Sequence, residues 1–357
     1  MFFNSKKNHL VGLDIGSRSI KVGELVENKK IRTQKKSGMN TVFTLKSFGM
    51  RDIPQDVIQE GIVKDSDTLA QSIRELITEN GIKEKNVAIS VSGYSVIVKR
   101  ITLPVMGEDE LRSRINYEAE QYIPFDINDV NLDFQIISES DNTPDQMNVI
   151  LVAAKKDMIN DYINLLEDVG LIPAVIDVDC FTLQNIFEIS YDATDEIIGL
   201  IDIGANKTSI NIIQNNYSLF MRDVSMGGDQ LTQEISNRMN CSYSEAESLK
   251  ISNSEDIFDL RSSTTMYWCS ELKRAVDFFY SSYSDSPIKK IYLSGGSAFL
   301  EGFPEALSEE TGIEIEIINP FQAFDIDPQA FTPDYLKRIA PQASICMGLA
   351  IRRVGDK

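Results

Sequence analysis

Hydrophobic and polar residues alternate in a short segment near the amino end of the chain. Val11, Leu13 and Ile15 fall on one side of an extended backbone, and a glycine-led loop separates them from a second alternating run that begins at Ile20. A period of two residues predicts strands, and the loop between them predicts a tight turn. The segment therefore predicts a β-hairpin whose first strand ends in one carboxylate, Asp14.

The same pattern recurs in the second half of the chain. Residues 199–210 repeat the order of strand, Asp202, Gly204, polar turn and second strand. One such hairpin alone is more often an ordinary strand end with a turn glycine. Two copies in matching contexts indicate an internal repeat, and hence an architecture of two related halves.

The two predicted turns have the chemistry of a phosphate site. A glycine at each turn lets the backbone bend sharply, so that successive N–H groups of residues 16–19 and 204–208 form a concave site for anions. Asp14 and Asp202 offer the hard oxygen ligands, or the acceptors for bound water, that Mg²⁺ requires. Two such hairpins facing each other would hold a triphosphate from both sides.

The remaining periodicities predict alternating strands and helices. Apolar positions spaced three and four residues apart predict helices over residues 66–80, 108–122, 157–169, 181–189, 229–240, 244–250, 260–283, 299–310 and 340–353. In the last of these, Pro341 suits the first turn, and Arg352 and Arg353 favour the last. Between residues 94 and 169 the order β-α-β-β-α predicts a compact unit inserted into a larger domain.

Three further features each allow a functional and a structural interpretation. Asp179 stands at a strand-to-helix junction, where it could cap the helix or orient a water molecule beside a nucleotide. Gly295 and Gly296 permit the backbone to approach a flat ring, although many strands enter helices through such a turn. The basic segment 27–38 is either a contact for acidic partners or lipid head groups, or a long solvated loop.

Composition excludes several classes of protein. The length of 357 residues suggests about two domains, and a net charge of −19 argues against a nucleic-acid surface while permitting a locally held nucleotide. Scattered cysteines (Cys180, Cys241, Cys269 and Cys346) and a single histidine argue against zinc and indicate reduced thiols in a cytosolic protein. No apolar run approaches a membrane span, and no signal-peptide core is present, which predicts a soluble, non-exported protein.

In this order, the motifs resemble those of the actin-like ATPase superfamily. Its five signatures are matched by Leu13–Lys21, Asp179–Gln184, Ile201–Thr208, Leu293–Ala298 and Ser344–Ala350. Ala246–Lys250 looks like the segment whose Glu and Lys contact the ribose in bacterial members. The resemblance implies an α/β fold of two duplicated domains around a nucleotide cleft, with a small inserted α+β subdomain.

The resemblance also implies ATP and Mg²⁺ as ligands of the cleft. It gives Asp179 a catalytic role and makes Asp14 and Asp202 the metal site. The residues implied in nucleotide binding are Gly16, Ser17, Arg18, Ser19, Lys21, Gly204, Ala205, Asn206, Thr208, Gly227, Glu247, Lys250, Gly295, Gly296 and Ser297.

Within the superfamily the chain is most similar to the PilM family of type IV pilus assembly proteins. The segments that carry this similarity are Lys6–Ser17, Tyr117–Phe125 and Gly170–Asp179. The family shares an early inserted subdomain with the cell-division protein FtsA, which ends in an amphipathic membrane helix; no such helix is expected here. The implied division is a first domain (1–93 and 170–194), an inserted subdomain (94–169), a second domain (195–339) and a C-terminal helix returning to the first (340–357).

This similarity implies a cytoplasmic adaptor with at most slow ATPase activity. It would be peripheral to the inner membrane, gripping the N-terminal tail of a PilN-like bitopic protein near the inserted subdomain, with Ile123–Phe125 as one candidate contact. Other pilus platform components and a second copy of the chain are further candidate partners; nucleic acid and direct membrane insertion are not expected. The alternatives are an FtsA-like filament-forming cell-division protein and a small-molecule kinase of the same fold.

Overall fold

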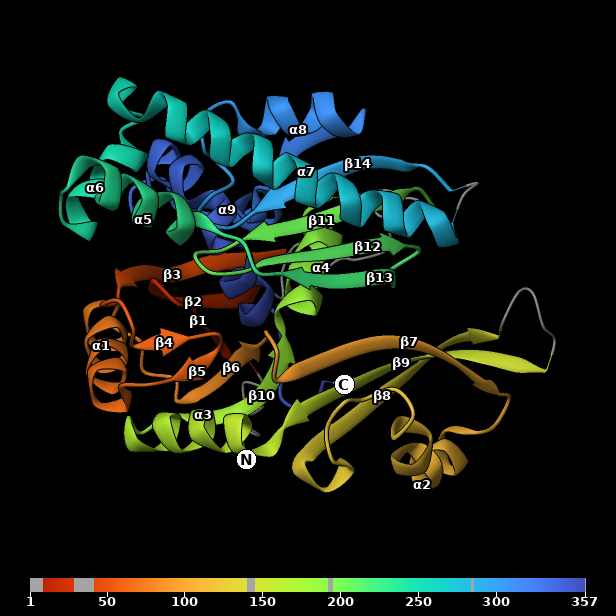
Figure 1. Ribbon diagram of the computed structural model, residues 1–357. Coiled ribbons are helices and arrows are strands. Elements are labelled where there is room, and N and C mark those ends of the chain that lie inside the picture. The colour runs from red at the N-terminus through yellow and green to blue at the C-terminus, as the bar shows by residue number, and fades with distance from the viewer. Residues whose placement is uncertain (1–8, 29–41, 140–144, 192–194, 284–285, 357) are drawn as a thin grey trace.

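Figure 1 shows the protein in a computed structural model, which describes residues 9–28, 42–139, 145–191, 195–283 and 286–356. Most of the basic segment predicted at 27–38 lies outside the described residues. No helix within the described ranges combines the length and apolar character needed to cross a bilayer.

Two sheets with the same strand order form the two halves of the molecule (Figure 1). The first has the order β10-β6-β1-β2-β3-β16, built from β1 (Val11–Ile15), β2 (Ser19–Asn28), β3 (Val42–Asp52), β6 (Asn86–Val91), β10 (Ile172–Val178) and β16 (Phe324–Asp325). The second has the order β13-β12-β11-β14-β15, built from β11 (Ile197–Ile203), β12 (Thr208–Gln214), β13 (Tyr217–Val224), β14 (Ile288–Ser294) and β15 (Glu314–Ile317). In each sheet an antiparallel three-stranded meander is followed by two parallel strands. The predicted duplication is confirmed.

The helices divide the apolar residues into separate cores. The first half carries α1 (Ser66–Glu79) and α3 (Lys156–Asp168), with the short strands β4 (Ile58–Gln59) and β5 (Ile62–Val63). The second half carries α5 (Gly228–Met239), α6 (Tyr243–Ile251), α7 (Phe258–Ser282), α8 (Phe303–Thr311) and the 3₁₀ turn Glu255–Ile257. A third core contains α4 (Asp179–Ser190), α9 (Pro333–Ala350), the 3₁₀ turn Pro320–Ala323 and side chains of both sheets. The two halves therefore share buried surface through α4 and α9.

A third, smaller sheet projects from the first half (Figure 1). Its order is β7-β9-β8, from β7 (Val96–Pro104), β8 (Val130–Glu139) and β9 (Gln146–Lys155), with α2 (Glu108–Ala119) and the 3₁₀ turn Ile127–Asp129. These elements have a core of their own. The helix α3, expected as part of the inserted unit, instead packs Tyr162, Leu165 and Leu166 into the core of the first half.

Two predicted helices differ from the structure at their ends. The last helix begins at Pro333 rather than at residue 340, because Thr332 caps it by accepting a hydrogen bond from the Tyr335 N–H, and Pro341 therefore lies inside the helix. It ends at Ala350, so Arg352 and Arg353 lie beyond its last turn and form ion pairs with Asp177 and Glu27. The helix predicted from residue 299 begins only at Phe303, after a series of turns.

Candidate functional site

The tips of the two repeated hairpins line one cavity of about 1640 Å³ between the halves. The start of α4, the start of α5, α6, the turn after β14, residues 50–64 and 90–94, and α9 also contribute to its wall. The predicted residues that line it are Asp14, Gly16, Ser17, Arg18, Ser19, Lys21, Asp179, Asp202, Gly204, Ala205, Asn206, Glu247, Lys250, Gly295, Gly296 and Ser297. The sequence thus predicted most of one contiguous site from segments distributed over the chain.

Thr208 and Gly227 do not line the cavity. The Thr208 hydroxyl is fully buried and donates to the carbonyl oxygen of Met226, at 2.9 Å. Gly227 packs on the second hairpin turn, where an added Cβ would lie 2.4 Å from the Ala205 carbonyl oxygen. Both residues therefore support the second hairpin turn without lining the cavity. The direct ligand contact predicted for them does not match their position in the structure.

The first hairpin holds a carboxylate and an ammonium side by side. Asp14 and Lys21 are partners in the strand ladder, and Lys21 Nζ lies 3.1 Å from Asp14 Oδ2. Burial raises the pKa of Asp14, with Lys21 opposing the shift. The Gly16 N–H closes the turn on the Ser19 carbonyl oxygen, at 3.2 Å, so this glycine shapes the turn and its N–H is already engaged.

The second hairpin closes in the same way but lacks the matching cation. The Gly204 N–H donates to the Lys207 carbonyl oxygen at 2.9 Å. Asp202 faces Ser209 in the ladder, where the first hairpin has a lysine. Burial raises the pKa of Asp202 to about 6, the nearby Asp179 carboxylate acts in the same direction, and a hydrogen bond from Ser294 opposes both.

Asp179 is not the N-cap of its helix. Val178 occupies that position, and Asp179 is the first residue of α4, whose start has no side-chain cap. Its carboxylate instead faces Lys207, with Oδ2 3.3 Å from Nζ. Burial acts to raise the pKa of Asp179, but Lys207 and hydrogen bonds from Ser92 and Ser90 outweigh it and hold the pKa below its ordinary value. The helix-cap alternative is therefore wrong, and a charged carboxylate stands at the cavity wall.

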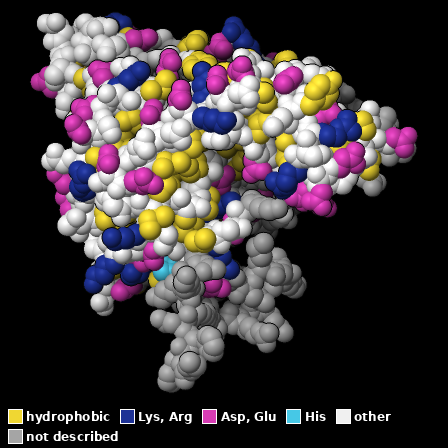
Figure 2. Space-filling model, turned by 90° about the horizontal axis from the view of Figure 1, so that it is seen from below, with side chains coloured by type: hydrophobic (Ala, Val, Ile, Leu, Met, Phe, Trp, Pro, Cys, Tyr) yellow, Lys and Arg dark blue, Asp and Glu magenta, His cyan; other side chains and the backbone are white. Residues whose placement is uncertain are grey.

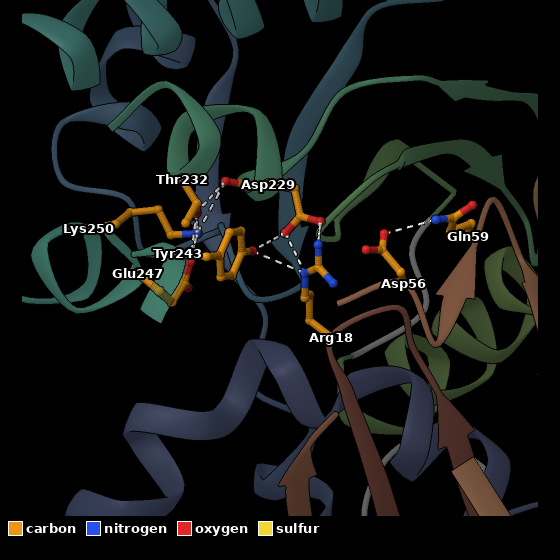
Figure 3. Close-up of polar contacts among 9 residues, drawn as sticks. Arg18, Asp56, Gln59, Asp229, Thr232, Tyr243, Glu247 and Lys250 are labelled. Atoms are coloured by element: carbon orange, nitrogen blue, oxygen red, sulfur yellow. Dashed lines mark hydrogen bonds and ion pairs between the residues drawn. The ribbon is translucent and has the colours of Figure 1, made fainter. Parts of the chain in front are cut away.

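Figure 3 shows that Glu247 and Lys250 form one network with Thr232 at the α5–α6 side of the cavity. Lys250 Nζ lies 2.8 Å from Glu247 Oε2 and donates to Thr232 Oγ1 at 2.8 Å. It also donates to the carbonyl oxygen of Gly228, at 3.2 Å. The two predicted ribose contacts are held in place by their neighbours, and both line the cavity.

The turn after β14 approaches the second hairpin closely. Gly295 has φ +91°, and an added Cβ there would lie 2.3 Å from the Ile203 carbonyl oxygen. The Ser297 N–H donates to the same carbonyl oxygen at 3.2 Å. Gly296, by contrast, is exposed and lines the cavity. The atom nearest to a Cβ added there would be Nε2 of Gln342, at 3.7 Å. Gly295 is thus required by packing, whereas the absence of a side chain at Gly296 keeps the cavity open.

Arg18 joins the two halves across the cavity (Figure 3). Its guanidinium makes two hydrogen bonds to the Asp229 carboxylate, one of them 2.9 Å from Nε to Oδ1. Nε also lies 3.1 Å from the Tyr243 hydroxyl, which donates to Asp229 at 2.6 Å. The guanidinium carbon stands 5.0 Å from the centre of the Tyr243 ring. A side chain predicted as a ligand contact therefore also fixes the first hairpin to α5 and α6.

The sequence alone did not identify three residues of the cavity wall, Asp229, Tyr243 and Lys207. Asp229 is 211 residues from Arg18, so no local pattern links the two. Lys207 did give a signal, because it lies at the tip of the repeated hairpin among residues already singled out.

The donor set of the cavity fits only a metal ion that keeps water or ligand oxygens. Among the described residues, no group of three or more histidine, cysteine, aspartate or glutamate side chains is placed to hold a metal ion. Asp14 and Asp202 provide two carboxylates on opposite hairpins. Mg²⁺ commonly binds through one or two carboxylates, waters and phosphate oxygens, and this arrangement is compatible with that pattern.

The repeated sheets, the helices shared between them and the paired turns define the class of the protein, which is the actin-like ATPase fold. A chain of MreB 5 from Spiroplasma citri, solved bound to AMPPNP, has the same fold, with a TM-score of 0.50 and 10% identity over 96% of this chain and 95% of that chain. FtsA of Bacillus subtilis (strain 168) is 22% identical over 67% of this chain, and the match spans 57% of the length of FtsA.

The sequence pattern of the family described as "Type IV pilus assembly protein PilM" matches residues 12–354, and the chain belongs to this family. A chain of the solved PilM-PilN type IV pilus biogenesis complex matches the structure with a TM-score of 0.86. The two are 29% identical, and the match covers 98% of this chain and 99% of that chain.

Proposed function

We propose that this protein is a nucleotide-binding adaptor that joins the cytoplasmic tail of a PilN-like protein to the type IV pilus assembly machinery. The observation that carries the proposal is the whole-chain match to the PilM family and to a chain of a PilM-PilN complex. Such an adaptor acts in the cytoplasm and reaches the inner membrane through its partner. Other platform components or a second copy of the chain would complete the assembly.

The nucleotide is ATP, bound in the cavity between the halves. The two hairpin turns hold its phosphates, Glu247 and Lys250 contact its ribose, and the turn at Gly295 and Gly296 lies against its base. Mg²⁺ neutralises phosphate charge there, and Asp14 and Asp202 hold the ion directly or through water. Asp179 lines the same cavity, and its carboxylate orients a water molecule for slow hydrolysis.

The small sheet with β7, β8 and β9 is the proposed contact for the partner tail. Val105 and Tyr117 are exposed hydrophobic side chains of this unit, and Figure 2 shows hydrophobic side chains interspersed with acidic and basic ones on the face seen from below. Cytoplasmic segments beside membrane spans carry an excess of Lys and Arg, which complements a chain of net charge −19. The contact suggested at Ile123–Phe125 is less suitable, because Ile123 is only 7% exposed and belongs to the core of the small sheet.

The packing also supports a division into domains. The first domain comprises residues 1–93 and 170–194 together with α3, and the inserted subdomain ends near residue 155. The second domain comprises residues 195 to about 317, shorter than the predicted 195–339, because β16 pairs with β3 of the first sheet and α9 packs on β1 and β2.

Calorimetry with ATP tests the nucleotide site. We expect Mg-ATP to bind, and removal of Mg²⁺ to weaken binding by about tenfold or more, because the carboxylates of the wall repel free triphosphate. Gly296→Val places a side chain in the cavity where the fold has room for it, so it should abolish binding and preserve stability. Gly107→Val, with open space around it, is the matched control. Equal affinity in the Gly296→Val variant would rule out this cavity as the nucleotide site.

A further inference from the structure

Lys207 makes a charge contact that crosses from one half of the molecule to the other. It lies at the tip of the second hairpin, and its Nζ is 3.3 Å from Asp179 Oδ2 at the start of α4. A second carboxylate, Asp223 on β13, lies 3.6 Å from the same ammonium. All three residues line the cavity.

The two hairpins differ in what their lysines neutralise. In the first, Lys21 is the ladder partner of Asp14 and is paired within its own hairpin. In the second hairpin, the ladder partner of Asp202 is Ser209. Lys207, two residues before Ser209, forms an ion pair with Asp179. The charge of Lys207 acts to lower the pKa of Asp202, but its ion pairs are with Asp179 and Asp223.

The Lys207 side chain is partly accessible from the cavity. Its side chain is 24% exposed and its partner Asp223 is 41% exposed, so the ammonium is reachable from the cavity. A lysine ammonium is a compact charge with three donors on a flexible stem, and it can turn from one anion to another. The terminal phosphoryl group of a triphosphate carries more negative charge than a carboxylate and offers three acceptor oxygens.

We propose that Lys207 discriminates nucleoside triphosphate from diphosphate at this site. Its ammonium, paired with Asp179 in this structure, pairs with the terminal phosphoryl oxygens of a bound triphosphate. A diphosphate lacks that group and leaves the pair with Asp179 intact. The exchange releases the Asp179 carboxylate to accept a hydrogen bond from water only when a triphosphate is bound. This inference rests on the proposed function, because it requires a nucleotide in the cavity.

The experiment measures ATP and ADP affinity of the full chain by calorimetry with Mg²⁺. We expect the wild type to favour ATP by about tenfold, a factor typical of one charge-assisted contact. Lys207→Met should lower that preference to about twofold or less while changing ADP affinity little. Lys289→Met, at an exposed lysine of β14, is the matched control and should keep the wild-type preference.

Asp179→Asn gives an independent test, because it releases Lys207 without removing it. ATP should bind several-fold more tightly to this variant and ADP with little change, and the gain should vanish when Lys207→Met is added. Equal losses of ATP and ADP affinity in Lys207→Met, or no ATP-specific gain in Asp179→Asn, would show that the pair is only structural. Failure of the wild type to bind either nucleotide would instead overturn the proposed function, and this inference with it.

Discussion

Asp202 is partly buried and has no lysine as its ladder partner, whereas Asp14 faces Lys21. Its pKa of about 6 lies above the ordinary value because burial disfavours the carboxylate. The folded protein therefore holds this proton more tightly than the unfolded chain does. The resulting destabilisation is absent below about pH 4, grows as the pH rises toward 6, and is complete at neutral pH.

Asp202→Asn should therefore stabilise the protein. At pH 7.5 we expect a gain of about 1–3 kcal/mol in the free energy of unfolding, since an uncharged side chain of the same shape replaces a partly buried charge. Denaturant unfolding at pH 7.5 and pH 4, without nucleotide, measures it, and the gain should disappear at the lower pH. Asp325→Asn, at an exposed aspartate, is the control. A loss of stability at pH 7.5 would mean that the Asp202 charge is compensated in the fold.

The residues of the site differ in how far sequence could predict them. Asp14, Asp202 and the turn glycines were predictable because a hairpin is a local structure whose strands, turn and carboxylate are close in the chain. The ion pair between Arg18 and Asp229 was not predictable, because these two residues are brought together only by the packing of the two halves.

At the scale of elements, α6 contributes to the cavity through two side chains whose positions depend on α5. Glu247 Oε2 accepts a hydrogen bond from Thr232 Oγ1 at 2.7 Å, and Thr232 is fully buried and does not line the cavity. The effect of a Glu247 substitution could therefore arise at the ligand or within the network.

Glu247→Ala should weaken ATP binding by about fivefold, the effect of losing one hydrogen bond to a ribose hydroxyl. Thr232→Val removes the hydroxyl that supports Glu247 and leaves the carboxylate in the cavity, so its effect should be smaller. Glu309→Ala on α8 is the surface control. Calorimetry with Mg-ATP compares the three variants, and an equal loss in Glu247→Ala and Thr232→Val would assign the effect to the network.

Helices and strands were predicted correctly where the signals lie within the element itself. The predictions were wrong where tertiary packing determines a boundary or a partner. The start of α9 was misplaced because Pro341 was interpreted as a first-turn proline, whereas Thr332 and Pro333 provide the actual start. The assignment of α3 to the inserted unit followed chain order. The apolar face of a helix does not reveal which sheet it packs against, and α3 packs against the first sheet.

The small sheet touches the second half of the molecule as well as the first. Arg100 of β7 donates to the Tyr283 hydroxyl at 3.5 Å, and the hydroxyl of Tyr94, in the turn before β7, is hydrogen-bonded to that of Ser225. The small sheet therefore contacts both sides of the cleft. Any change in the angle between the halves must alter either these contacts or the position of the small sheet, which gives nucleotide and partner tail a physical route to influence each other.

We expect Mg-ATP to change the affinity for a peptide of the PilN-like cytoplasmic tail by about five- to tenfold, and the peptide to change ATP affinity by the same factor, because coupling in binding free energy is reciprocal. Calorimetric titration of each ligand with and without the other measures both factors. Deleting residues 96–155, the small sheet alone, should abolish peptide binding and leave ATP binding in place.

The contacts across the cleft should carry this coupling. Tyr94→Phe combined with Arg100→Ala removes these two hydrogen bonds, so the coupling factor should fall toward one. Phe keeps the aromatic ring that Tyr94 contributes to the cavity wall, so the affinity for ATP alone should change little. Tyr117→Phe, at an exposed tyrosine of α2, is the control within the same small unit. If the double variant retained full coupling, the influence of nucleotide on the tail would have to pass through the shared core of α4 and α9 instead. If the form lacking residues 96–155 bound the tail as well as the intact protein, the adaptor surface would lie outside the small sheet.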